Sequence, residues 1–136
     1  MRYAAATTLA IALAFAAAAC HDTDVPGPPS TVPASITDTF TGTLAPAGTS
    51  AQPFTVVETG HLTVTLNSVT PSAAVGIGIG SPSAGGCAIV SSKSPVQPGA
   101  TVALSGIALK GNLCLSVFDV GNLVDTVTYT VTVFHS

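Results

Sequence analysis

From Ile36 onward, aliphatic and polar residues alternate with a period of two. The alternation is clearest in residues 126–134, where Val127, Tyr129, Val131 and Val133 are separated by threonines. Successive side chains of a strand point to opposite faces, so this period predicts strands with one buried face. Burying each of these four side chains contributes about 1.5–3 kcal/mol, which is enough to set the register of the strand. We expect the threonine face to be in contact with solvent.

The same period recurs in about eight short segments, and no segment has the pattern of an amphipathic helix. Glycine, proline, asparagine and serine turns separate the segments, as is typical of an antiparallel β-sandwich or barrel. The segments are residues 36–44, 52–57, 61–69, 74–80, 87–92, 101–108, 113–119 and 126–134.

Residues 74–80 alternate Val75, Ile77 and Ile79 with glycines. Glycine weakens a strand unless the space is needed. The pattern therefore predicts that a loop, a partner strand or a ligand closely approaches this strand. A nucleotide-binding glycine loop is a poor alternative, because no helix follows.

The N-terminus has the pattern of an export signal. A short basic start is followed by an uncharged stretch, residues 4–19, and the small residues 17–19. As a helix this stretch would be roughly 24 Å long, which is short of a membrane span of ~30 Å. We expect residues 1–19 to be a cleaved, helical signal peptide.

Cys20 follows the expected cleavage site directly. Ala17-Ala18-Ala19-Cys20 resembles the lipobox of a bacterial lipoprotein signal, although the usual leucine three places before the cysteine is missing. The resemblance implies acylation of Cys20, anchorage of the exported protein in a membrane through acyl chains, and a periplasmic or extracellular domain. His21 in the next position favours the outer membrane or cell surface. The alternative is ordinary cleavage, which leaves an N-terminal thiol.

A proline-rich segment separates this cysteine from the strands. Residues 22–35 contain four prolines, which exclude helix and favour an extended spacer of ~3 Å per residue. We therefore divide the chain into a signal peptide (1–19), a lipidated cysteine with a disordered tether (20–35) and a β-sandwich domain (36–136).

Charged residues are few: three basic against six acidic. So few basic residues form no basic patch, which argues against nucleic-acid binding. Cys87 and Cys114 lie in different expected strands of an exported protein, which predicts a disulfide. A redox or metal pair is the alternative, but no CxxC spacing or nearby histidine supports it.

Other chemistry has weaker signals. The three histidines, His21, His61 and His135, lack zinc-site spacing, and no G-x-S-x-G motif marks a catalytic serine. We therefore predict no catalytic residues, no metal site and no cofactor. One weak calcium candidate exists: Asp119, Asn122 and Asp125 form an acidic loop whose oxygens suit Ca²⁺, the alternative being a solvated turn.

Several short motifs have a recognisable pattern: Phe40-Thr41-Gly42-Thr43-Leu44, Phe54-Thr55-Val56, Gly60-His61-Leu62-Thr63-Val64, residues 111–119, Gly121-Asn122 and residues 128–133. Together they resemble the bacterial pre-peptidase C-terminal domain, a jelly-roll-like β-sandwich of exported proteins. The resemblance implies that fold. Some members of the family bind calcium, which slightly favours calcium binding by the acidic loop. Leu113 and Cys114 depart from the family pattern, since the family has aromatics there, and no peptidase domain is present.

Together these features predict a lipid-anchored, non-enzymatic envelope domain that acts as a structural or binding module. Its partner would be an envelope protein or a polysaccharide. The first alternative is a soluble secreted domain that binds protein or carbohydrate. The second is a small hydrolase, which would need a polar cleft with convergent titratable groups.

Overall fold

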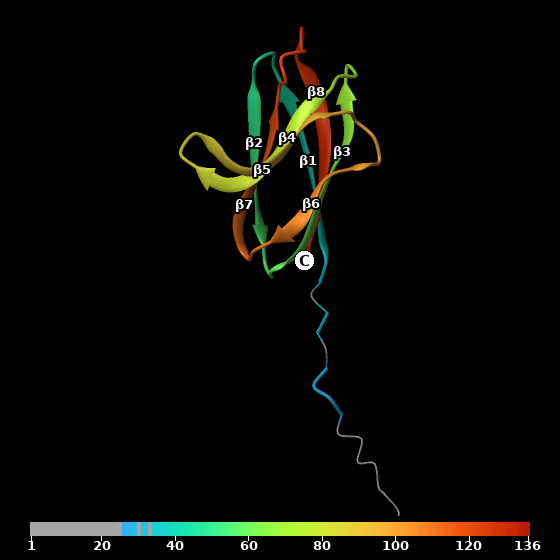
Figure 1. The fold of residues 1–136 in the computed structure, drawn as a ribbon, viewed down its shortest axis with the longest axis vertical. Helices are drawn as coiled ribbons and strands as arrows, with labels where there is room; N and C mark the ends of the chain where they lie inside the picture. The colour runs from blue at the N-terminus through green and yellow to red at the C-terminus, as the bar shows by residue number, and fades with distance from the viewer. Residues whose placement is uncertain (1–25, 30, 33) are drawn as a thin grey trace, which may run out of the picture. The chain divides into compact units, whose positions relative to one another are not determined.

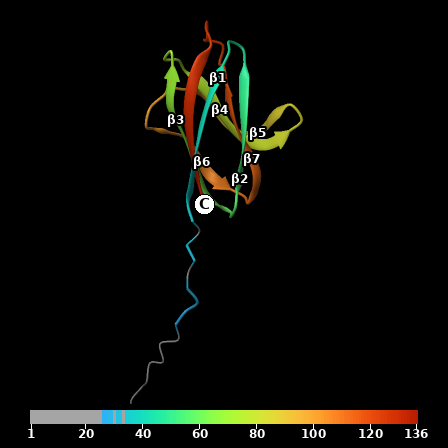
Figure 2. The same cartoon turned by 180° about the vertical axis from the view of Figure 1, so that it is seen from behind.

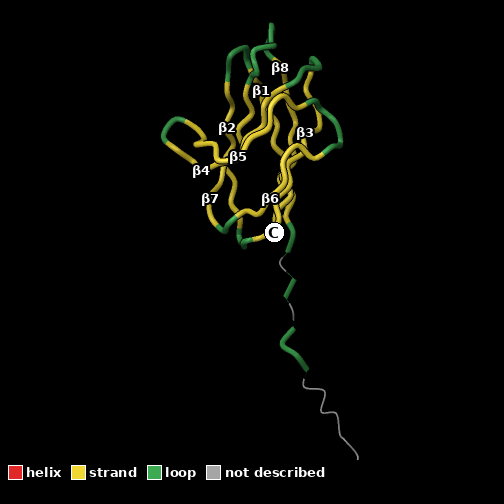
Figure 3. Tube along the Cα trace, viewed as in Figure 1, coloured by secondary structure: helices red, strands yellow, loops and turns green. Residues whose placement is uncertain are grey.

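A computed structural model of the chain describes residues 26–29, 31–32 and 34–136. The predicted signal helix and Cys20 lie outside the described residues. Described residues before Ile36 are exposed and form no strand. The rest is all-β, with eight strands and no helix in the described part (Figures 1 and 3). The strands are β1 (Ile36–Leu44), β2 (Thr49–Val56), β3 (Gly60–Thr70), β4 (Val75–Ser83), β5 (Gly86–Val96), β6 (Val102–Ala108), β7 (Gly111–Phe118) and β8 (Val127–His135).

The strands form two antiparallel sheets of four, in the orders β1-β8-β3-β6 and β2-β7-β4-β5. The β4–β5 hairpin stays within one sheet, and each of the other connections crosses from one sheet to the other. This is the strand order of a jelly roll, and it confirms the predicted β-sandwich. Figure 2 shows the two layers from behind.

The core consists of the aliphatic side chains that the two sheets direct at each other. In β8, Val127, Tyr129, Val131 and Val133 are all buried, and the threonines between them face outward, as the alternation predicts. Strand β8 pairs with β1 on one side and β3 on the other. Among the described residues, all the buried core side chains lie after Ile36, so the sandwich has a hydrophobic core of its own.

Tyr129 connects the two sheets at this core. Its hydroxyl lies 2.7 Å from the Ser50 hydroxyl of β2, in the opposite sheet. Gly42 lies directly opposite Tyr129 in the β1–β8 ladder, and a Cβ at Gly42 would stand 2.5 Å from the tyrosine oxygen. The glycine therefore provides the room that the tyrosine ring occupies.

Neighbouring groups approach the glycines of β4 closely, as predicted. A Cβ at Gly76 would overlap the ring of Phe118, and one at Gly80 would overlap the Ala88 carbonyl group. At Gly78 a Cβ would lie 3.0 Å from the Ile89 side chain. The approaching groups are thus the neighbouring strands β7 and β5, not a ligand.

The predicted disulfide joins Cys87 of β5 to Cys114 of β7, with a Cα–Cα distance of 5.8 Å. These strands are not neighbours, because β4 lies between them. In a flat sheet they would be roughly 9.5 Å apart. The β4–β5 hairpin must therefore bend over the outer face of its sheet, and register shifts at Val75/Ile77 and Ile79/Gly80 mark the bend.

Candidate functional site

Asp119, the first residue of the predicted calcium loop, accepts hydrogen bonds from backbone amides. Its Oδ2 accepts a hydrogen bond from the Ala47 N–H (2.7 Å). Its Oδ1 accepts from Gly121, Asn122 and Leu123 (2.9–3.3 Å). The hydrogen bond from the Ala47 N–H has the largest effect on the pKa of Asp119, and together with the three loop amides it holds this pKa below its ordinary value, against the opposing effect of desolvation.

These hydrogen bonds give Asp119 a structural role. They connect the β7–β8 loop to the β1–β2 turn, where Ala47 has a positive φ of 56°. The Asp119 N–H also donates to the Gly48 carbonyl (3.0 Å). The four donors occupy lone pairs that a calcium ion would need, while Asn122 and Asp125 are exposed.

His61 and His135 lie on the adjacent strands β3 and β8 and differ in burial. His61 is exposed, His21 lies outside the described residues, and His135 is fully buried at the end of β8. His135 Nε2 donates to Asp38 Oδ2 at 3.1 Å, and its ring lies 5.6 Å from that of Phe54. Its Nδ1 is buried and has no partner among the described residues.

Sequence reasoning missed this pair, in which His135 is buried and the Asp38 side chain is 37% exposed. The signal was present, because residue 135 continues the inward period of β8 by one step and residue 38 lies on the inward period of β1. No serine donates to His135 in the described chain, so no Ser-His-Asp relay is formed there. Within residues 26–29, 31–32 and 34–136, no group of three His, Cys, Asp or Glu side chains is placed to hold a metal ion.

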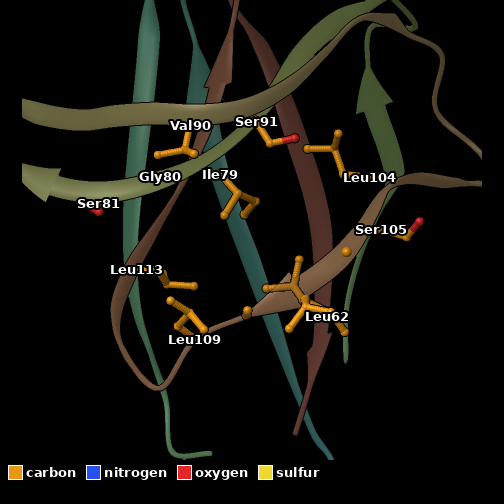
Figure 4. Close-up of a pocket in the computed structure, with 13 residues that line it drawn as sticks. Leu62, Ile79, Gly80, Ser81, Val90, Ser91, Leu104, Ser105, Leu109 and Leu113 are labelled. Atoms are coloured by element: carbon orange, nitrogen blue, oxygen red, sulfur yellow. The ribbon is translucent and has the colours of Figure 1, made fainter. Parts of the chain in front are cut away.

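An apolar groove of about 280 Å³ lies between β6 of one sheet and β4 and β5 of the other (Figure 4). Both β5 and β6 are edge strands, so the groove lies where the two sheets part. No charged residue lines it. Its aliphatic side chains come from Leu62, Ile79, Val90, Leu104, Ile107, Ala108, Leu109 and Leu113.

The outer face of the β1-β8-β3-β6 sheet is rich in threonine. The ladders place Thr39, Thr132 and Thr65 in one row across three strands. Phe134 lies in the next row, between Thr37 and Thr63, and is 40% exposed. The face thus presents hydroxyl groups around one exposed aromatic ring.

No helix in the described part of the chain has the length and hydrophobicity to cross a membrane. Neither the protein-family models nor the curated proteins searched include a match to the chain. The strand order and the geometry of the groove, the threonine face and the disulfide are therefore the basis for any functional proposal.

Proposed function

We propose that this protein is a lipid-anchored, non-enzymatic domain of the bacterial cell envelope that acts as a structural or binding module. One observation carries the proposal: the two domain cysteines are joined to each other. The third cysteine, Cys20, is thus free for another role, and it follows three alanines at the expected signal cleavage site. The disulfide also suits an oxidising compartment outside the cytosol.

The chemistry of the domain supports a non-enzymatic role. The buried His135 pairs with the partly exposed Asp38 at the end of the core, and the groove between β6 and the β4–β5 hairpin is lined mostly by aliphatic side chains. The similarity to the pre-peptidase C-terminal domain supports the same proposal. Gly42 and Tyr129, from its first and last motifs, pack against each other here.

The test is the intact mass of the full-length protein purified from bacterial membranes. We expect an N-terminus at Cys20 with a mass increase equal to a diacylglycerol, with or without a further acyl chain. The Cys20→Ala variant should leave the membrane fraction. An unmodified thiol at Cys20 in the wild-type protein would contradict the proposal.

A second candidate is a soluble secreted module that binds a neutral polysaccharide, and the threonine face around Phe134 favours it. Hydroxyl groups and an aromatic ring are the groups that contact a sugar's hydroxyls and its apolar face. Electrophoresis through gels containing neutral polysaccharides tests this candidate. Binding should retard the wild-type protein and not Phe134→Ser, while Val124→Ser, which alters an exposed side chain of the β7–β8 loop, should behave like wild type. Equal mobility with and without each polysaccharide would rule it out.

A further inference from the structure

The tether enters the domain at the same end as the mouth of the apolar groove. Strand β1 begins at Ile36, which lies opposite His135 at the end of β8. The Leu62–His135 pairing of β3 with β8 places the start of the groove at the same level. The 56–60 and 108–111 connections also meet here, where the Lys110 N–H donates to the Thr59 hydroxyl at 3.0 Å.

This end carries aliphatic side chains that the sandwich leaves exposed. Ile107 and Leu109 are each 70% exposed and form part of the groove wall. Val57, in the adjacent connection, is 47% exposed. We call Val57, Ile107 and Leu109 the apolar rim.

We propose that the apolar rim and the groove behind it form a membrane-docking surface, which takes up the hydrocarbon chains of bilayer phospholipids. This inference rests on the proposed function, because a lipid on Cys20 would bring this end of the domain to the bilayer. The tether from residue 21 to 35 spans at most about 50 Å, so it does not prevent the domain from reaching the membrane surface. Within the domain, the chain enters β1 at Ile36, at the end that carries the apolar rim.

The charges favour lipid tails over lipid headgroups as the occupant. Glu58 and Lys110 are exposed in the two connections and carry opposite charges, Asp38 at this end pairs with His135, and no charged residue lines the groove. Attraction to anionic lipids is thus weak at this end, whereas transfer of aliphatic side chains into an apolar phase is favourable. Binding should therefore depend little on salt or on the lipid headgroup.

The experiment measures sedimentation of residues 21–136 with neutral phosphatidylcholine vesicles. This fragment contains the whole core and lacks both Cys20 and the signal segment, so vesicle binding reports the docking surface alone. We expect the wild-type fragment to bind and the Ile107→Ser/Leu109→Ser double variant to have a partition coefficient lower by tenfold or more. Both side chains are mostly exposed, so the double variant should fold, and a urea transition with an intact disulfide checks this.

Val124→Ser is the matched control. Val124 is 89% exposed in the β7–β8 loop, at the opposite end of the sandwich, and its substitution should leave partitioning unchanged. No binding by the wild-type fragment, or equal binding by the double variant, would overturn the inference. The inference would also be overturned if the wild-type fragment bound only to anionic vesicles. The same holds if the Ile107→Ser/Leu109→Ser substitutions changed only the self-association of the fragment. The mass of Cys20 tests the anchor separately, so the failure of one proposal is distinguishable from the failure of the other.

Discussion

The β4 glycines allow a graded test of how closely the β4–β5 hairpin folds over its own sheet. In Gly80→Ala, the new methyl group would overlap the carbonyl group of Ala88, which is backbone and cannot rotate away. In Gly78→Ala, the methyl group would lie 3.0 Å from the Ile89 side chain, which is 43% exposed and can move. Gly106→Ala is the matched control, because nothing lies within 4 Å of its added Cβ.

The expected free energies of unfolding follow from these contacts. Replacing glycine by alanine without strain stabilises by about 0.4–1 kcal/mol through the unfolded state. Overpacking costs about 1–3 kcal/mol. We therefore expect Gly106→Ala to be slightly more stable than wild type, Gly78→Ala to be close to it, and Gly80→Ala to be less stable by about 1–2 kcal/mol.

Urea unfolding of residues 21–136 measures these differences, and thiol titration of the unfolded protein measures disulfide formation. The titration checks that each variant keeps the Cys87–Cys114 disulfide, so that the differences in stability report the contact at the added methyl group. If Gly80→Ala equals Gly78→Ala in stability and both are fully oxidised, then Gly80 is not required for the bend, and the argument from close approach is wrong.

Three further predictions concern the links between distant segments. Replacing both Cys87 and Cys114 by alanine should lower the free energy of unfolding by about 3.5 kcal/mol, the chain-entropy value for the observed separation of 27 residues. Reducing the disulfide of the wild-type protein should lower the free energy of unfolding in urea by the same amount. A loss below about 1 kcal/mol would contradict the entropy argument. Tyr129→Phe should lower the free energy of unfolding by about 0.5–1.5 kcal/mol, because the hydrogen bond to Ser50 is lost. The same substitution in a Ser50→Ala background should lower it clearly less. Equal losses in the two backgrounds would show that the bond contributes nothing to stability. The pKa of Asp119 is lower in the folded protein, so its contribution to stability is present above about pH 4 and is lost as the pH falls through the folded pKa. The Asp119→Asn variant should therefore have a urea midpoint that depends less on pH in this acidic range. An unchanged slope would refute the role of the four amide donors.

The strands could be predicted from the sequence because the signals for them are local. The two-residue alternation identifies the buried face of each strand, and glycine and proline turns mark where strands end. All eight strands lie where this pattern predicts them. The disulfide could also be predicted, because the chain has one cysteine before the domain and two within it.

The sequence by itself thus determined the strands, their buried faces and the close approach at the glycines of β4. Only the tertiary structure decided which groups approach them, and which strands became the edges that border the apolar groove. It also decided that Asp119 binds the turn containing Ala47, 72 residues away, and that His135 pairs with Asp38, 97 residues away. Such contacts depend on the order of strands across two sheets, and a local alternation contains no information about which distant strand becomes a neighbour.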